Sequence, residues 1–242
     1  MSSPLVLSLF PGIGLLDMAF EAEGFTVVRG PDLLWGGDIR RFHPPAGRFD
    51  GIIGGPPCQA HSRFAALVER NGLPKAECRI AEFERCVDEA RPAWFVMENV
   101  PDAPKPCVPG YHVQAELVRD HWCGGETMRL RRFCLGLPDA RRPRPRWQVE
   151  TLALHRSDPE PSALASGSEW HAKDGRPSGT KSRATVANHL RKQGLPPDFF
   201  AESPFKVAAQ VKLLGNGVPL AMGRAVARTV RDALAAGVEV AI

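Results

Sequence analysis

The sequence predicts an α/β fold in which short apolar strands alternate with helices. The chain opens with an apolar run of strand length, Leu5 to Phe10, then the turn Pro11 to Gly14, then helically spaced apolar residues from Leu15 to Ala22. Two more apolar runs, Phe49 to Ile53 and Trp94 to Met97, end abruptly at glycines or polar residues. A strand, a glycine turn and a helix begin a nucleotide-type α/β unit, in which small residues let a ligand approach the helix N-terminus.

The remaining segments predict one more strand and three helices. Phe25 to Arg29 is typical of a second strand. The spacing of apolar residues predicts helices over Ala76 to Ala90 and over Leu220 to Ala236, and a further short helix over Val113 to Val118.

Composition and charge are those of an ordinary globular protein. Hydrophobic residues make up 43% and charged residues 24% of the 242 residues, which is a typical balance. No apolar run approaches the roughly 20 residues of a membrane helix, and the first residues lack the pattern of a signal peptide. The six cysteines form no C-x-x-C pair. We therefore expect reduced thiols in a cytoplasmic protein, with neither a metal site nor a disulfide framework.

Cys58 differs from the other cysteines by its setting. It follows Gly54 to Pro57 and precedes the polar stretch Gln59 to Ser62. Glycine and proline cannot continue a strand or a helix, so Cys58 is expected on a stiff loop after an apolar strand. A buried cysteine acting as a small hydrophobe is the alternative. The polar surroundings favour an accessible thiol, and hence a nucleophile.

A carboxylate follows the neighbouring apolar run. Glu98 and Asn99 come directly after Trp94 to Met97. Open α/β sheets bind ligands at the carboxyl ends of their strands, so Glu98 and Cys58 are expected to share one substrate. A loop carboxylate or a helix cap is the alternative for Glu98.

The segment Leu137 to Ser182 changes in composition toward proline, arginine, glycine and serine. Composition alone is compatible with a linker or a partly disordered loop. The stretch from Arg129 to Arg146, which overlaps the start of this segment, is rich in arginine. The planar guanidinium group of arginine suits contacts with phosphates and bases. A solvated surface run is the alternative, since the net charge of +4 is modest.

Seven short motifs resemble those of the cytosine-C5 DNA methyltransferase family. In chain order they are Ser8 to Leu15, Gly37-Asp38-Ile39, Pro56-Pro57-Cys58-Gln59, Glu98-Asn99-Val100, Arg129-x-Arg131, Arg191 to Phe199 and Leu214 to Pro219. Ser8 stands where the family has an acidic residue, and Thr127 stands where it has glutamine. The stretch between the second strand and Gly37 is shorter than in most family members, so the resemblance implies that one helix is trimmed to a turn there. The resemblance implies a compact member with the mixed, Rossmann-like sheet of S-adenosylmethionine-dependent methyltransferases. Residues 1–146 and 207–242 would form the catalytic domain, and residues 147–206 a small target-recognition region.

The same resemblance implies S-adenosylmethionine as the cofactor. It places Phe10 against the cofactor, Asp32 at its ribose and Asp38 at its adenine amino group. A turn aspartate after proline is the alternative for Asp32. The implied cofactor-binding residues are Phe10, Gly12, Ile13, Gly14, Leu15, Asp32, Asp38, Ile39, Pro56, Asn216 and Val218.

The implied catalytic residues are Cys58, Glu98, Arg131 and Arg129. Cys58 would add to C6 of a flipped-out cytosine, Glu98 would act as the acid at N3, and Arg131 would balance charge at O2. Pro57, Gln59, Ser62 and Asn99 would bind the substrate base. The segment Arg63 to Lys75 would close over it.

The implied partner is double-stranded DNA, bound by a monomer without a metal and away from membranes. A recognition region this short implies a short or degenerate target. A cognate restriction endonuclease and a prokaryotic or phage origin are compatible with this assignment. Two other functions remain open, a transfer-RNA cytosine-C5 methyltransferase and a catalytically silent DNA-binding relative.

Overall fold

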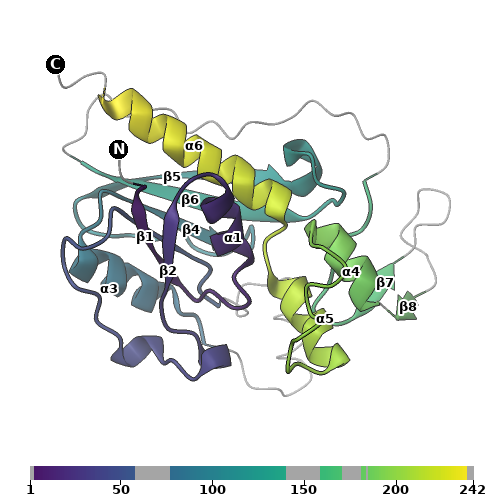
Figure 1. Ribbon diagram of the computed structural model, residues 1–242. Helices are drawn as coiled ribbons and strands as arrows, with labels where there is room; N and C mark the ends of the chain where they lie inside the picture. The colour runs from purple at the N-terminus through teal and green to yellow at the C-terminus, as the bar shows by residue number, and fades with distance from the viewer. Residues whose placement is uncertain (1–2, 58–76, 140–158, 171–180, 184, 239–242) are drawn as a thin grey trace.

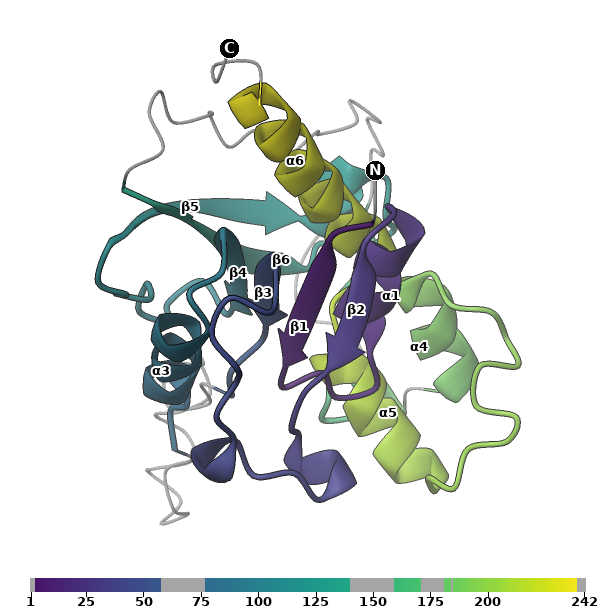
Figure 2. The ribbon, with the colours of Figure 1, turned by 60° about the vertical axis from the view of Figure 1, so that its left-hand side comes forward.

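The computed structural model describes residues 3–57, 77–139, 159–170, 181–183 and 185–238. Its centre is a six-stranded sheet in the order β2-β1-β3-β4-β6-β5 (Figures 1 and 2). The four strands from β2 to β4 are parallel, whereas β6 is antiparallel to both β4 and β5. The sheet is therefore mixed, as expected. Its strands are β1 (Leu5–Leu9), β2 (Thr26–Arg29), β3 (Gly51–Gly54), β4 (Trp94–Asn99), β5 (Tyr111–Arg119) and β6 (Leu130–Pro138).

Helices cover both faces of the sheet. One face packs against α1 (Leu15–Ala22) and α6 (Leu220–Val238), and the other against α3 (Ile80–Ala90). The helix over Ala76 to Ala90 was thus predicted with its start four residues too early. Two 3₁₀ turns, η1 (Leu33–Trp35) and η2 (Ile39–Arg41), stand between β2 and β3, which confirms that a full helix is trimmed there.

The three central strands are buried on both faces. In β4, Trp94 and Val96 face the cluster under α1 and α6, whereas Phe95 and Met97 face the cluster under α3. Strands covered on both sides need apolar residues throughout rather than in alternation. This requirement is why the sequence shows them as short continuous apolar runs.

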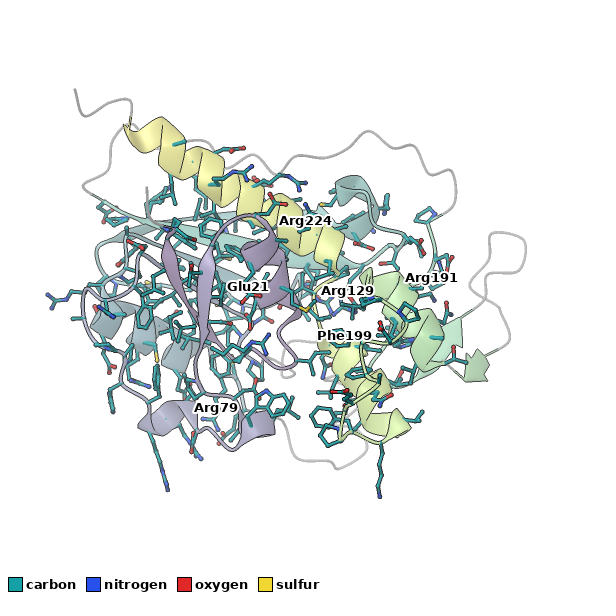
Figure 3. All side chains as sticks on the ribbon, in the orientation of Figure 1. Glu21, Arg79, Arg129, Arg191, Phe199 and Arg224 are labelled. Carbon is teal, nitrogen blue, oxygen red and sulfur yellow. The ribbon has the colours of Figure 1, made fainter. Side chains whose placement is uncertain are left out.

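A salt-bridge cluster fastens α6 to α1. Glu23, just after α1, pairs with Arg224 at 2.8 Å and with Arg228 and Arg231 at 3.2 Å each. Figure 3 shows Arg224 on the α6 ribbon close to α1. Because α6 begins just after Val218 at the carboxyl edge of the sheet, this contact fixes both ends of the chain in one body.

Two further helices lie beside the carboxyl edge of the sheet, α4 (Val186–Gln193) and α5 (Val207–Asn216), next to a hairpin of β7 (Ser168–Trp170) and β8 (Lys181–Arg183) (Figure 1). Leu190 and Leu214 join Leu15 of α1 in a third apolar cluster. Helix α5 therefore packs both on α4, in the region expected to recognise the target, and on the start of α1, which follows the turn predicted to bind the cofactor.

The expected helix over Val113 to Val118 is wrong. This segment lies within β5, which pairs along its whole length with β6. Its residues Gln114, Ala115, Glu116 and Leu117 have good helix propensity. Pairing with a neighbouring strand outweighs that local preference, as is common for strands whose sequence is not β-branched.

The described cysteines other than Cys78 and Cys107 are buried. Burial raises the pKa of Cys86 and of Cys134 to about 11 and that of Cys123 to about 12. These thiols are therefore poor nucleophiles at neutral pH. The described residues contain no group of potential metal ligands, and none of the described helices is long and apolar enough to cross a membrane.

Candidate active site

A cavity of about 980 Å³ opens at the carboxyl ends of β1, β3 and β4. The register pairs Leu9 with Gly54 and Gly54 with Met97, so the three strands end at the same level. Of the residues predicted to bind the cofactor, the cavity is lined by Phe10, Gly12, Ile13, Leu15, Asp32, Pro56, Asn216 and Val218. Segments from both ends of the chain thus meet around one space.

The glycine turn after β1 has an unusual backbone. Phe10 and Gly12 both have φ of +56°, and Gly14 has φ of +82° and caps α1. A left-handed conformation is readily adopted by glycine, but it costs a phenylalanine on the order of 1 kcal/mol. A strained residue at the wall of a cavity is typical of a ligand-binding turn.

Two residues of the η1 segment hold Gly12 from both sides. The Asp32 carboxylate accepts the Gly12 N–H at 2.8 Å, and Trp35 Nε1 donates to the Gly12 carbonyl at 2.7 Å. The other Asp32 oxygen accepts the Leu34 N–H. Asp32 therefore stabilises the turn, and because it also lines the cavity it can contact a ligand there.

Three predicted cofactor residues do not line the cavity. Asp38 caps η2 and pairs with Arg40, which holds the pKa of its carboxyl at about 2. Ile39 is buried in the cluster under α3. Gly14 lies against Arg29, where a Cβ would come within 2.3 Å of the guanidinium. Their cofactor roles stay predictions.

The sequence did not single out a buried carboxylate beside this turn. Asp17 of α1 lines the cavity, accepts from the Ser8 hydroxyl at 2.5 Å and pairs with Arg29 Nε at 3.0 Å. Burial raises the pKa of its carboxyl, although Ser8 and Arg29 oppose that shift. Ser8, the position where the resembling family carries an acid, thus has an acid as its partner. In the sequence, the sign of this site was an acidic residue, Asp17, among the apolar positions of α1.

Glu98 and Arg131 form the polar pair of the site. Both lie at the cavity wall, and Arg131 Nε is 3.0 Å from Glu98 Oε1. Burial raises the pKa of Glu98, because desolvation outweighs the opposing charges of Arg131 and Arg129. A Cβ on Gly55 would approach Glu98 Oε2 to 3.0 Å, so this glycine leaves room for the carboxyl group.

Asn99 connects the carboxylate strand to the loop that carries the predicted nucleophile. Its Nδ2 donates to the Pro56 carbonyl at 3.0 Å, and its Oδ1 accepts the Val100 N–H. Pro57 O in turn accepts the N–H of Arg79, before α3. The chain is therefore fixed up to Pro57. Cys58, Gln59 and Ser62 lie outside the described residues.

Arg129 joins the cavity to the segment before β7. It is buried, and its guanidinium donates to the carbonyls of Ala163 at 3.2 Å and Asn216 at 3.3 Å. Burial and the nearby Arg131 lower its pKa to about 9. Figure 3 places Arg129 where the sheet meets α4 and α5. A single side chain thus bonds to both sides of the cavity.

Replacing Arg129 by lysine is expected to lower the free energy of unfolding by about 1–3 kcal/mol, because one ammonium cannot bond both carbonyls and at least one loses its partner. Urea unfolding measures the change. Arg231→Lys on α6 is the matched control and should be near neutral, since its ion pair is half exposed. Equal stability of the two variants would contradict the bridging role.

Thr127 does not line the cavity, but its hydroxyl oxygen accepts the N–H of Arg129 at 3.3 Å. The Asp120 carboxylate accepts both the N–H of Thr127, at 2.9 Å, and its hydroxyl, at 2.8 Å. These bonds close the turn between β5 and β6 around η4 (Asp120–Cys123). Thr127 therefore shapes the turn that precedes Arg129 and Arg131.

The comparisons with known proteins agree on one family. The family model for C-5 cytosine-specific DNA methylases matches residues 36–106. The type II methyltransferase M.NgoPII of Neisseria gonorrhoeae is 32% identical over 39% of this chain and 33% of its own length, and M.AquIA of Picosynechococcus is 32% identical over 39% and 48%. The chain thus spans about a third to a half of the length of these curated relatives.

Solved structures extend the likeness in fold to nearly the whole chain. A proposed DNA modification methyltransferase encoded within a prophage (E. coli) has a TM-score of 0.67 at 18% identity, over 96% of this chain and 100% of the other. Spodoptera frugiperda DNMT2 has a TM-score of 0.60 at 15% identity, over 96% and 100%. At these identities the likeness shows the fold alone. The sequence likeness to C-5 cytosine-specific DNA methylases therefore covers residues 36–106 and the aligned parts of the curated relatives, and the likeness in fold extends over nearly the whole chain.

Proposed function

We propose that this protein is a DNA (cytosine-5-)-methyltransferase that methylates C5 of a flipped-out cytosine through a covalent Cys58 adduct. The observation that carries the proposal is the pair of buried Glu98 with Arg131, joined through Asn99 to Pro56, two residues before Cys58 in the sequence. An acid, an arginine and the Pro56–Pro57 segment that precedes Cys58 thus line one cavity.

The residues that line the cavity fit S-adenosylmethionine. A glycine at the cavity wall leaves room near the backbone: no atom lies within 4 Å of the position that a Cβ on Gly12 would take. The Asp32 carboxylate lies at the cavity wall, where it can accept hydrogen bonds from the ribose hydroxyl groups of the cofactor. When bound, this cofactor supplies an electrophilic methyl group on a sulfonium, and the chain's part is to position it.

The chain's own residues would activate the base. C5 of cytosine is a weak nucleophile, and addition of the Cys58 thiolate to C6 makes the ring an enamine. The raised pKa of Glu98 keeps a proton available for N3 as that addition proceeds. After methyl transfer, loss of the C5 proton and elimination of the thiolate restore the ring and free Cys58. A base inside a duplex cannot be attacked from above its plane, so it must first be flipped out.

Tritium transfer from labelled S-adenosylmethionine to unmethylated duplex DNA, followed by base analysis, tests the proposal. We expect the label in 5-methylcytosine. Label in transfer RNA alone would favour the RNA methyltransferase. DNA binding without label in either nucleic acid would favour the silent relative.

A further inference from the structure

A second feature of the cavity lies at the turn between β5 and β6. Leu117, Trp122 and Met128 are 44%, 38% and 45% exposed, which is unusual for large apolar side chains so close together in the sequence. The Arg119 guanidinium lies 5.6 Å from the centre of the Trp122 ring. We call Leu117, Arg119, Trp122 and Met128 the hairpin surface.

The hairpin surface is continuous with the reaction cavity. Arg119 and Met128 line the same cavity as Glu98 and Arg131. The register places Arg119 opposite Leu130 and Val118 opposite Arg131, so the surface begins one residue from the catalytic arginine. The hairpin surface therefore forms part of the wall of this cavity.

The turn is rigid enough to present these side chains. The Asp120–Thr127 bonds close it, Arg119 donates to the Met128 carbonyl at 3.4 Å, and Cys123, the last residue of η4, is buried. Among the described residues no acid pairs with Arg119, so its charge is balanced only by the Trp122 ring. A fixed arginine beside an exposed aromatic ring and a methionine suits a polyanion that also carries flat apolar groups.

We propose that the hairpin surface binds the DNA strand next to the flipped cytosine, with Arg119 on a backbone phosphate and Trp122 and Met128 against the neighbouring nucleotide. The inference rests on the proposed function. Aromatic rings bind nucleotides by stacking without reading sequence, and arginine binds phosphate through its fork. The contact therefore holds the strand and leaves target choice to other residues.

Binding of a fluorescein-labelled, mixed-sequence DNA duplex, followed by anisotropy across a salt series, tests the inference. Trp122→Ala is expected to weaken binding about tenfold with an unchanged salt slope, and Trp122→Phe to restore most of it. Arg119→Ala is expected to lower the slope of log K against log salt by about 1. Matched controls are Val28→Ala at the other edge of the sheet, where Val28 is 43% exposed, and Arg231→Ala on α6.

Affinity for S-adenosylmethionine and the unfolding temperature are measured on every variant. Both should match the wild type, which separates lost DNA contacts from a collapsed turn. DNA binding of Trp122→Ala and Arg119→Ala equal to that of the controls would overturn the inference, as would a defect seen only with transfer RNA. Absence of methyl transfer by the wild type would refute the proposed function. The binding measurements decide separately whether the hairpin surface binds DNA.

Discussion

Replacing Cys58 by alanine is expected to abolish methyl transfer, by on the order of 10⁴-fold or more, while S-adenosylmethionine still binds. Without the thiolate no covalent bond forms at C6 and C5 stays unreactive. Cys86, Cys123 and Cys134 cannot substitute, because they are buried and their pKa values are raised. Labelled-methyl transfer measures the rate, and isothermal titration measures cofactor affinity.

A DNA substrate with 5-fluorocytosine at the target makes this test sharper. With fluorine at C5 there is no C5 proton to lose, so the thiolate cannot be eliminated. The adduct therefore persists after methyl transfer and is visible as a protein–DNA band on a denaturing gel. We expect that band with the wild type and with Cys107→Ala, whose thiol is exposed. We expect no band with Cys58→Ala. Turnover by Cys58→Ala would disprove the covalent route.

Glu98→Gln is expected to slow methyl transfer by about 10²–10⁴-fold, the usual contribution of a general acid. Glutamine preserves the shape of the side chain but has no proton to give to N3. The wild-type rate should also fall as pH rises through the raised pKa of Glu98, whereas the variant should lose that dependence. Glu116→Gln, exposed on β5, is the control. Near-normal rates in Glu98→Gln would remove Glu98 from the acid role.

The same substitution has an opposite effect on stability. A carboxyl group whose pKa is raised by folding favours the folded state while protonated, and this contribution is lost as pH rises from the ordinary glutamate pKa through the raised value. At a pH above the raised pKa of Glu98, the wild type carries an unfavourable buried charge, which Arg131 offsets only in part. We expect Glu98→Gln to unfold at the same or a higher temperature and to lose that pH dependence. A large loss of stability would show that the ion pair outweighs the cost of burial.

The sequence pattern was sufficient to predict the strands that are buried on both faces of the sheet, because such burial requires apolar residues along the strand. Strands β1, β3 and β4 appear in the sequence as apolar runs because no position in them faces water. The glycine turn was equally visible, since Gly12 and Gly14 adopt conformations that other residues rarely take. Strand β5 was not visible, because Gln114 to Leu117 suits a helix and only pairing with β6 makes it a strand.

The sequence by itself determined the α/β class, the order of the motifs and the meeting of the glycine turn after β1, the Pro56–Pro57 segment and Glu98 at one edge of the sheet. These depend on short-range patterns and on the rule that parallel strands end at one edge. Tertiary structure alone decided that Asp17 partners Ser8, that Asn99 holds Pro56 and that Arg129 bridges Ala163 and Asn216. Such contacts form between residues that are distant in the chain. Each depends on desolvation and on hydrogen-bond geometry, which packing creates and no local pattern encodes.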